Sequence, residues 1–177
     1  MKAIIKSKNQ WIDMLLHNDC EPEESLDQIT REASVLFSTP FVLINLLTSE
    51  HVVFKSAVGL TQGDIFDRSG SFCAATNETS KVYAVPNALE HPDFKNHPFV
   101  RGEPGVRSYI GKALHAPDGM RIGTLCMMDT KARTYTAEQV GAFSELATTA
   151  EEHLQTLLDP TNGGLLRFSN LASQPAN

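Results

Sequence analysis

Apolar residues recur along this chain with two periods, which predict where its helices and strands lie. Steps of three and four residues, typical of one helix face, run through residues 22–37. The apolar positions there are Leu26, Ile29, Ala33 and Leu36. A shorter stretch with the same spacing, through Trp11, Ile12, Leu15 and Leu16 and ending at Asn18-Asp19, predicts a preceding helix on the same core.

Extended segments alternate with turn signals in the middle of the chain. Residues 41–47 and 51–58 are rich in β-branched and aromatic side chains around a short polar turn, and they predict a β-hairpin. Residues 82–85 predict a third strand that Pro86 ends, because proline cannot donate to a strand ladder. Residues 106–115 and 120–128 flank Ala116-Pro117-Asp118-Gly119 and predict a second hairpin.

A long helix is predicted after Thr136, because Gln139 lies three residues later at the spacing of a capping box. Asp159-Pro160 and Gly163-Gly164 end it, and we expect the tail of residues 159–177 to be mobile. The helix carries an alternating three- and four-residue seam typical of a short coiled coil. Its members are Val140, Phe143, Ala147, Ala150, Leu154 and Leu157.

The order of elements predicts an α+β fold with a central antiparallel β-sheet of five to six strands. The N- and C-terminal helices are expected on one face of the sheet. Residues 69–105, called the lid segment below, are expected over a pocket on the other face. We expect one core built from Leu26, Ile29, Phe41, Leu43, Leu125 and Leu146.

Composition places the chain among single-domain globular proteins. It has 177 residues, of which 41% are hydrophobic and 20% charged. A net charge of −6 without a Lys/Arg cluster disfavours nucleic acid and an anionic membrane as partners. Because neither a signal peptide nor a run of roughly 20 apolar residues is present, we expect a cytoplasmic protein. The three cysteines, Cys20, Cys73 and Cys126, lack CxxC spacing and are expected to be reduced thiols.

Several motifs in order resemble the GAF domain family of small-molecule sensors, over residues 21–158. The middle of the chain carries Gly70–Ala75, Val85–Ala88 and His91–Phe94 with Pro98 and Val100. The later part carries Val106–Gly111, Leu114, Gly119, Ile122–Cys126 and Asp129, similar to the family's closing strands. Pro40–Leu47, Val53–Ser56 and Gly59 resemble its first hairpin.

The resemblance implies a module that binds a small ligand or transmits packing changes and is dimeric through its terminal helices. It divides the chain into an N-terminal helical extension (1–20), the GAF-like domain (21–158) and the tail (159–177). Some positions depart from the family pattern. Asn87 and His91 stand where aspartate is common, His97 where asparagine is common, and Ser108 and Ala113 where aromatic and proline residues are common. We therefore expect a pocket shifted from acidic toward neutral or titratable chemistry.

The expected ligand-binding residues are Phe72, Cys73, Asn87, His91, Phe94, Arg107 and Tyr109. Arg107 and Tyr109 share a strand face by the period-two rule, so Arg107 could hold an anionic group while Tyr109 stacks on an apolar one. The alternative is that Arg107 pairs with Asp93 and pins the lid segment. His91 and His97 can change charge between about pH 5 and 8, so lid stability is expected to depend on pH, with the sign open.

Three catalytic or metal interpretations are weaker. Some single-domain relatives resemble a free methionine sulfoxide reductase, in which Cys73 would need a second, resolving thiol. We expect Cys126 on a core strand and Cys20 before the first firm helix, which leaves that constellation incomplete. Cys73 with His115 as nucleophile and base is weaker still. His91, Asp93 and His97 offer metal-ligand chemistry, but nothing in their spacing fixes them on one face.

The function favoured by the sequence is a stand-alone, non-catalytic sensory domain that binds an unidentified small molecule and takes part in signal transduction. No catalytic residue or metal site is expected, and no cofactor can be named. We expect a homodimer and, since no output domain follows Pro160, a separate signalling protein. The alternatives are a redox enzyme using Cys73 and a dimerisation module with a collapsed pocket.

Overall fold

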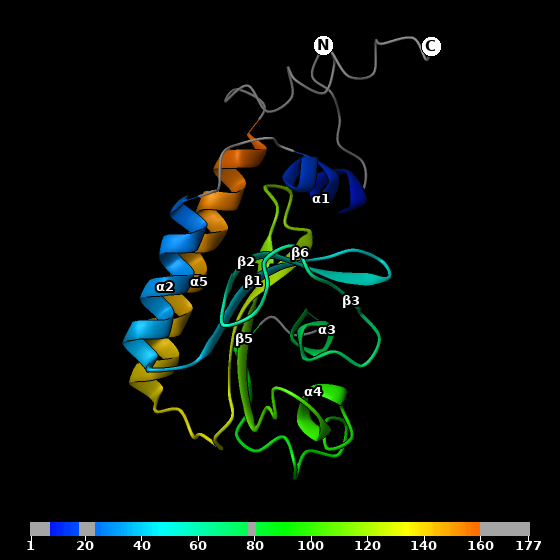
Figure 1. The fold of residues 1–177 in the computed structure, drawn as a ribbon. Coiled ribbons are helices and arrows are strands. Elements are labelled where there is room, and N and C mark those ends of the chain that lie inside the picture. Colours follow the sequence, from blue (N-terminus) through cyan, green and yellow to red (C-terminus); the bar gives the residue numbers. More distant parts are fainter. Residues whose placement is uncertain (1–7, 18–23, 78–80, 160–177) are drawn as a thin grey trace.

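A computed structural model describes residues 8–17, 24–77 and 81–159 and shows a sheet with helices on both faces (Figure 1). The helices are α1 (Lys8–His17), α2 (Glu24–Phe37), α3 (Phe72–Asn77), α4 (Pro98–Arg101) and α5 (Ala137–Leu158). The strands are β1 (Phe41–Leu47), β2 (His51–Val58), β3 (Ile65–Asp67), β4 (Tyr83–Val85), β5 (Ser108–His115) and β6 (Arg121–Asp129).

The six strands form one sheet in the order β3-β2-β1-β6-β5-β4, and every neighbouring pair is antiparallel. The predicted α+β class is confirmed, as are both hairpins, with the second shifted by one or two residues. β3 and α4 were not predicted. β3 has only three residues, two of them exposed, so it shows no usable alternation. α4 is a single turn begun by Pro98 and capped by the His97 side chain.

α2 and α5 lie side by side on one face of the sheet, and α1 covers the end of that face (Figure 1). The Trp11 indole donates to Asp118 at 2.8 Å, and the Lys55 ammonium donates to the Leu15 carbonyl at 2.7 Å. These bonds tie α1 to the β5–β6 turn and to β2. The predicted end of α1 at Asn18-Asp19 lies outside the described residues.

Two predicted helix faces need correction. Leu36 is 63% exposed, and Phe37 is the buried residue that follows Ala33 by one helical turn. Val35 beside Leu36 is also exposed. In α1, the Leu16 side chain is 38% exposed, and the Met14 side chain is buried instead. Val35 and Leu36 therefore form an outward apolar pair on α2.

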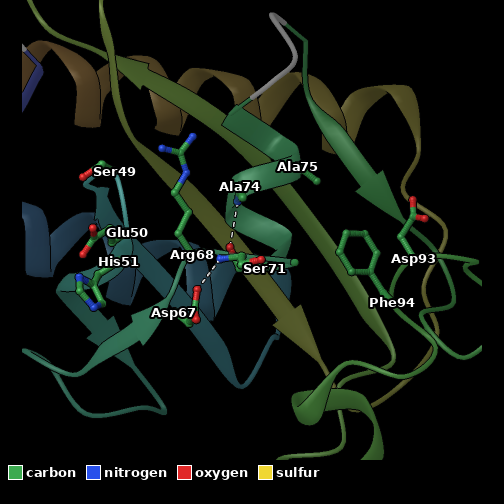
Figure 2. A pocket seen from close by; sticks show the side chains of 12 residues that line it. Ser49, Glu50, His51, Asp67, Arg68, Ser71, Ala74, Ala75, Asp93 and Phe94 are labelled. Carbon is green, nitrogen blue, oxygen red and sulfur yellow. Dashed lines mark hydrogen bonds between the residues drawn. The ribbon is translucent and has the colours of Figure 1, made fainter.

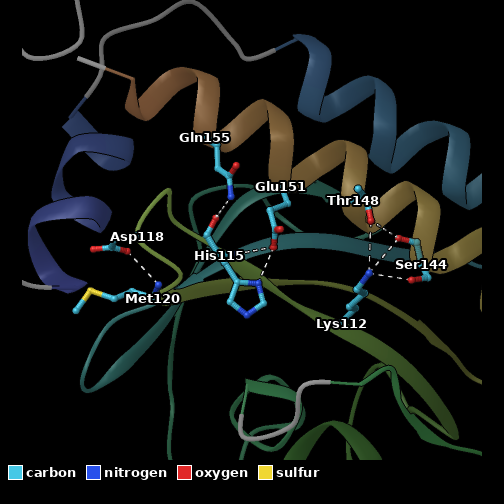
Figure 3. A network of polar contacts seen from close by, with 8 residues as sticks. All are labelled: Lys112, His115, Asp118, Met120, Ser144, Thr148, Glu151 and Gln155. Carbon is cyan, nitrogen blue, oxygen red and sulfur yellow. Dashed lines mark hydrogen bonds and ion pairs between the residues drawn. The ribbon is translucent and has the colours of Figure 1, made fainter. Parts of the chain in front are cut away.

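α5 begins with the predicted capping box, in which Thr136 and Gln139 exchange side chain to backbone hydrogen bonds. Polar contacts fasten its middle to β5 (Figure 3). The Lys112 ammonium donates to the Ser144 hydroxyl at 2.8 Å, and the Glu151 carboxylate lies 2.7 Å from both the His115 ring and its backbone nitrogen.

The predicted coiled-coil seam faces the chain's own core. Phe143, Ala147, Ala150 and Leu154 are fully buried against the sheet, α2 and α1, whereas Val140 and Leu157 are partly buried. An amphipathic helix on a sheet buries the same stripe that a coiled coil would use. These four positions are therefore not available to a partner.

The prediction of one core is wrong, because the sheet has a separate core on each face. Leu26, Ile29 and Leu125 belong to the core under α2 and α5, and Leu146 packs at its edge. Leu43 belongs to the opposite core and Phe41 packs against that one. Alternate residues of a strand point to opposite faces, and both faces of β1 are covered. We call these the helix-side core and the lid-side core.

Among the described residues, no helix is both long and apolar enough to cross a bilayer. Parts of the expected N-terminal extension and most of the expected mobile tail lie outside the described residues.

Candidate functional site

A cavity of about 390 Å³ lies in the lid-side core, between the sheet and the segments that carry α3 and α4. Apolar side chains from β1, β2, β6 and the lid segment form most of its wall. These are Leu43, Val52, Phe54, Phe66, Phe72, Phe99 and Met128, with the sulfur of Cys73. Its volume is within the range of small-molecule sites, which combine apolar walls with a few polar groups.

The cavity adjoins an open groove of about 820 Å³ that has a different chemistry (Figure 2). Residues common to both hollows are Asp67, Ser69, Gly70, Ser71 and Asp93. Figure 2 shows Asp67 and Asp93 on opposite sides of the groove. Arg68 lies beside Asp67, and its guanidinium donates to the Thr48 carbonyl at 3.0 Å. Two carboxylates thus line both the groove and the adjoining apolar cavity.

Two thiols meet at the inner wall of the cavity. The sulfur of Cys73 on α3 lies 3.9 Å from that of Cys126 on β6, and both side chains are buried. The Asn45 amide donates to Cys73 at 3.2 Å and reaches Cys126 at 3.6 Å. The Thr124 hydroxyl donates to the other end of that amide at 2.8 Å, which directs its NH₂ toward the sulfurs.

The two thiols differ in acidity because one donates to the other. The hydrogen bond from Cys126 lowers the pKa of Cys73, against the opposing effect of burial, and the hydrogen bond from the Asn45 amide assists. The same hydrogen bond, together with burial, raises the pKa of Cys126. Cys73 is therefore the thiol of this pair that ionises first.

α3 is held against the sheet by an aromatic and hydroxyl contact. The Phe72 ring stacks on Tyr109 with ring centroids 5.0 Å apart, and the Tyr109 hydroxyl lies 2.6 Å from that of Thr76. Burial raises the pKa of Tyr109 well above its usual value, so the hydroxyl stays neutral. A Cβ at Gly111 would come within 2.3 Å of the Tyr109 oxygen, so this position must lack a side chain for the contact to form.

Three of the expected site residues lie around the cavity and groove. Phe72 and Cys73 line the cavity, and Phe94 lines the groove while stacking on Phe72 with centroids 4.1 Å apart. Tyr109 is fully buried behind Phe72 and reaches neither hollow.

Asn87, His91 and Arg107 also line neither hollow. The Asn87 amide donates to Glu90 at 2.8 Å and its carbonyl accepts from Leu89, so it shapes a turn. The Arg107 guanidinium donates to the carbonyls of Val100 and Val106, both at 3.0 Å. One alternative was that Arg107 fastens the lid segment by pairing with Asp93. Arg107 does fasten the lid segment, but through backbone carbonyls and not through Asp93. It also precedes β5, so it does not share a strand face with Tyr109.

His97 lines the cavity and caps α4. Its Nδ1 accepts from the Phe99 backbone nitrogen at 3.0 Å, and burial lowers its pKa. The His91 Nδ1 accepts from the Asp93 backbone nitrogen at 3.3 Å. Both rings thus serve local backbone bonds, and within 8–17, 24–77 and 81–159 no cluster of three His, Cys, Asp or Glu residues could hold a metal.

Sequence reasoning missed most of the cavity wall. Asn45 gave the clearest signal, because it is a polar residue in the middle of the apolar run 41–47 and so needed a buried partner. The approach of Cys126 to Cys73 depends on where α3 packs, which spacing does not give. Asp67 and Asp93 give the groove two carboxylates. The expected shift from acidic toward neutral or titratable chemistry, relative to similar sequences, stays a prediction.

Comparison with known proteins agrees with this architecture. The GAF domain family model matches residues 21–154. A curated cyclic di-GMP phosphodiesterase of Pseudomonas aeruginosa is 33% identical over 141 residues, which cover 78% of this chain. The chain spans only 24% of the length of that relative.

Solved structures show the same fold at low sequence identity. The PixJ GAF domain of Thermosynechococcus elongatus has a TM-score of 0.65 at 13% identity and covers 97% of both chains. Free methionine-R-sulfoxide reductase of Neisseria meningitidis, with its substrate bound, has a TM-score of 0.63 at 16% identity over 88% of this chain and 94% of that one. With the family model matched over most of its length, this chain belongs to the GAF domain family.

Proposed function

We propose that this chain is a non-catalytic sensory domain that binds a small molecule in the lid-side cavity. The observation that carries the proposal is the cavity itself, which is lined mostly by apolar and aromatic side chains and shares Asp67 and Asp93 with the adjoining groove. Carboxylates accept hydrogen bonds and attract cations. The chemistry fits a ligand with an apolar ring and a cationic or hydrogen-bond-donating end. An open cavity of this size also argues against a collapsed pocket.

The strand β5 would carry the signal to the helices. On its lid side Tyr109 contacts Thr76 of α3, and on its helix side Lys112 and His115 bind Ser144 and Glu151 of α5 (Figure 3). A ligand that moves α3 would therefore act on a strand fastened to α5. We expect binding of a cationic aromatic probe, para-fluorophenethylamine, to change amide hydrogen exchange in α5. Glu151→Gln should reduce that change.

A homodimer would use the outer face of the helices. The buried seam of α5 cannot serve, but Val35 and Leu36 are exposed and Leu146 lies beside them in a shallow apolar hollow. Leu36→Glu is expected to dissociate such a dimer, whereas Leu154→Glu would disrupt the fold because Leu154 is fully buried. Analytical ultracentrifugation checks this. A Leu36→Glu variant that sediments as the same dimer would contradict the proposed face.

We propose that a separate signalling protein receives the signal. The matched curated relative is named as a cyclic di-GMP phosphodiesterase, and this chain resembles one part of it. A regulatory role toward an effector of that type is consistent with the match, whereas phosphodiesterase activity is not proposed for the chain.

Ligand binding can be tested with two probes that share a ring and differ in charge. Fluorine NMR should show that para-fluorophenethylamine, a cation, binds more tightly than para-fluorophenylacetate, an anion. Ser69→Trp places an indole at the shared rim of cavity and groove and should reduce binding, whereas Thr61→Trp, at an exposed position lining neither hollow, should not. Equal binding of both probes, or no effect of Ser69→Trp, would contradict the proposed site.

A second candidate function is reduction of free methionine sulfoxide, and the 3.9 Å approach of the two thiols favours it. The sequence argument against it was the lack of a resolving thiol, and that argument is wrong. In this reaction Cys73 would take the sulfoxide oxygen as a sulfenic acid and release methionine, and Cys126 would then form the disulfide and release water. Thiol-dependent turnover that is lost in Cys73→Ser would establish it. Lack of turnover by the reduced, folded chain would exclude it.

A further inference from the structure

We propose that Cys73 and Cys126 form a peroxide-reactive thiol pair that closes into a disulfide between α3 and β6. The two sulfurs are already in contact at 3.9 Å, and a disulfide requires about 2.05 Å. Cys73 lines the cavity, so a small hydroperoxide can reach it from solvent through the groove. Cys126 is fully buried behind it and has no such access. One thiol is placed to meet the oxidant and the other to resolve the product.

The surroundings of Cys73 favour its thiolate, which is the reactive form of cysteine. The Asn45 amide donates to its sulfur at 3.2 Å, and Thr124 fixes the direction of that amide. The Tyr109 hydroxyl lies 4.0 Å away on the same side of the sheet. These three polar groups surround the two sulfurs in an otherwise apolar core. Cysteines packed only as small apolar residues would not need a directed donor such as the Asn45 amide.

The chemistry balances with a hydroperoxide as the oxidant. The Cys73 thiolate attacks the outer peroxide oxygen, the O–O bond breaks, and the alkoxide takes up the thiol proton and leaves as an alcohol. Cys73 is then a sulfenic acid. The Cys126 thiol attacks its sulfur, the S–O bond breaks, water leaves and the S–S bond forms. Two thiols are oxidised, and the peroxide is reduced to an alcohol and water.

The bond would link a short helix on the sheet surface to a central strand. β6 lies between β1 and β5 inside the sheet, whereas α3 is a six-residue helix next to the cavity rim. Closing the gap between the sulfurs therefore pulls α3 inward and narrows the cavity. The functional meaning of a narrower cavity rests on the proposed function, whereas formation of the disulfide does not.

Peptide mapping of the full chain tests the inference directly. The reduced protein is treated with a small excess of hydrogen peroxide, its remaining thiols are alkylated under denaturing conditions, and the digest is analysed without reduction. We expect a linked pair of peptides that contain Cys73 and Cys126, with a loss of two hydrogen masses and Cys20 alkylated. Cys20→Ser should give the same linkage at the same rate.

Two variants separate the roles of the thiols. Cys126→Ser should accumulate a sulfenic acid at Cys73 that dimedone traps, and Cys73→Ser should slow oxidation of Cys126 by about tenfold or more. If both thiols stay fully alkylatable in folded, peroxide-treated wild-type protein, or if the link joins Cys20, the inference is overturned. The test needs no methionine sulfoxide and no fluorinated probe, so its failure is distinguishable from a failure of the proposed ligand binding.

Discussion

The two faces of the sheet are covered in different ways. The helix-side core holds three aromatic residues, Trp11, Phe37 and Phe143, among many aliphatic ones, and its four seam residues on α5 are fully buried. The lid-side core is covered by short helices and loops and contains a stacked cluster of rings around a cavity. Long amphipathic helices fill their face, whereas short segments leave space. The comparison shows a filled core on one face and a core with a cavity on the other, and the cavity is where we propose that a ligand binds.

Leucine truncations should give the largest difference between the faces. Leu125→Ala in the helix-side core is expected to lower the free energy of unfolding by about 2–5 kcal/mol, because Leu125 is fully buried in a filled core. Leu43→Ala removes the same atoms from a cavity wall, where fewer contacts exist to lose, and should cost less. Urea denaturation measures both. A near-neutral effect of Leu125→Ala on the free energy of unfolding would contradict the expected difference between the two cores.

The contact between α3 and β5 should make a smaller contribution. Tyr109→Phe removes the hydrogen bond with Thr76 and is expected to cost about 1 kcal/mol, since Thr76 keeps its bond to the Phe72 carbonyl. Tyr83→Phe is the matched control, because the contact that the Tyr83 hydroxyl makes with His91 is long, at 3.4 Å. Equal costs in urea denaturation would show that the buried hydroxyl pair does not hold α3.

The smallest expected effect is a pH dependence confined to the lid side. Burial lowers the pKa of His97 in the folded state, so below the unfolded value of about 6.5 the unfolded chain binds more protons. The contribution of the neutral His97 to the free energy of unfolding is therefore complete above the unfolded pKa. It is lost as the pH falls through the lowered folded pKa. Protonation of Nδ1 would also remove the acceptor that caps α4.

His97→Asn sharpens this prediction, because asparagine caps helices without titrating in this range. Denaturation midpoints followed from neutral to mildly acidic pH should fall less in the variant than in the wild type. Parallel pH curves for the two proteins would show that His97 does not cause the dependence.

The fold followed from the sequence because its signals are local. The apolar run of β1, the turn at Pro117 and Gly119 and the capping box at Thr136 each act within a few residues, and the structure contains all three elements. The GAF resemblance, carried by motifs in order, fixed how they assemble. Leu36 was wrongly predicted to be buried, because Leu36 and Phe37 lie three and four residues after Ala33 and both fit the spacing of one helix face. Helical periodicity alone does not decide which of two such neighbours faces the core.

The site followed only in part, because it depends on packing between distant segments. Phe72 and Cys73 were placed at the pocket by a motif, but Cys126 reaches Cys73 across 53 positions of sequence. Arg107 and His91 looked suited to a ligand, yet their polar atoms serve nearby backbone groups. Residue type shows what a side chain can bind, whereas the competing backbone partners appear only in three dimensions. The ligand-binding roles themselves stay predictions.

Met127 and Met128 provide the most direct test, because these neighbours in β6 point to opposite faces. Met127 is fully buried in the helix-side core, and Met128 lines the cavity. Methyl NMR of methionine-labelled protein, titrated with para-fluorophenethylamine, reports both faces at once. We expect a saturable shift of the Met128 methyl with little change at Met127 and Met14. A Met128 signal that does not move, or a larger response at Met127, would contradict ligand binding in the lid-side cavity.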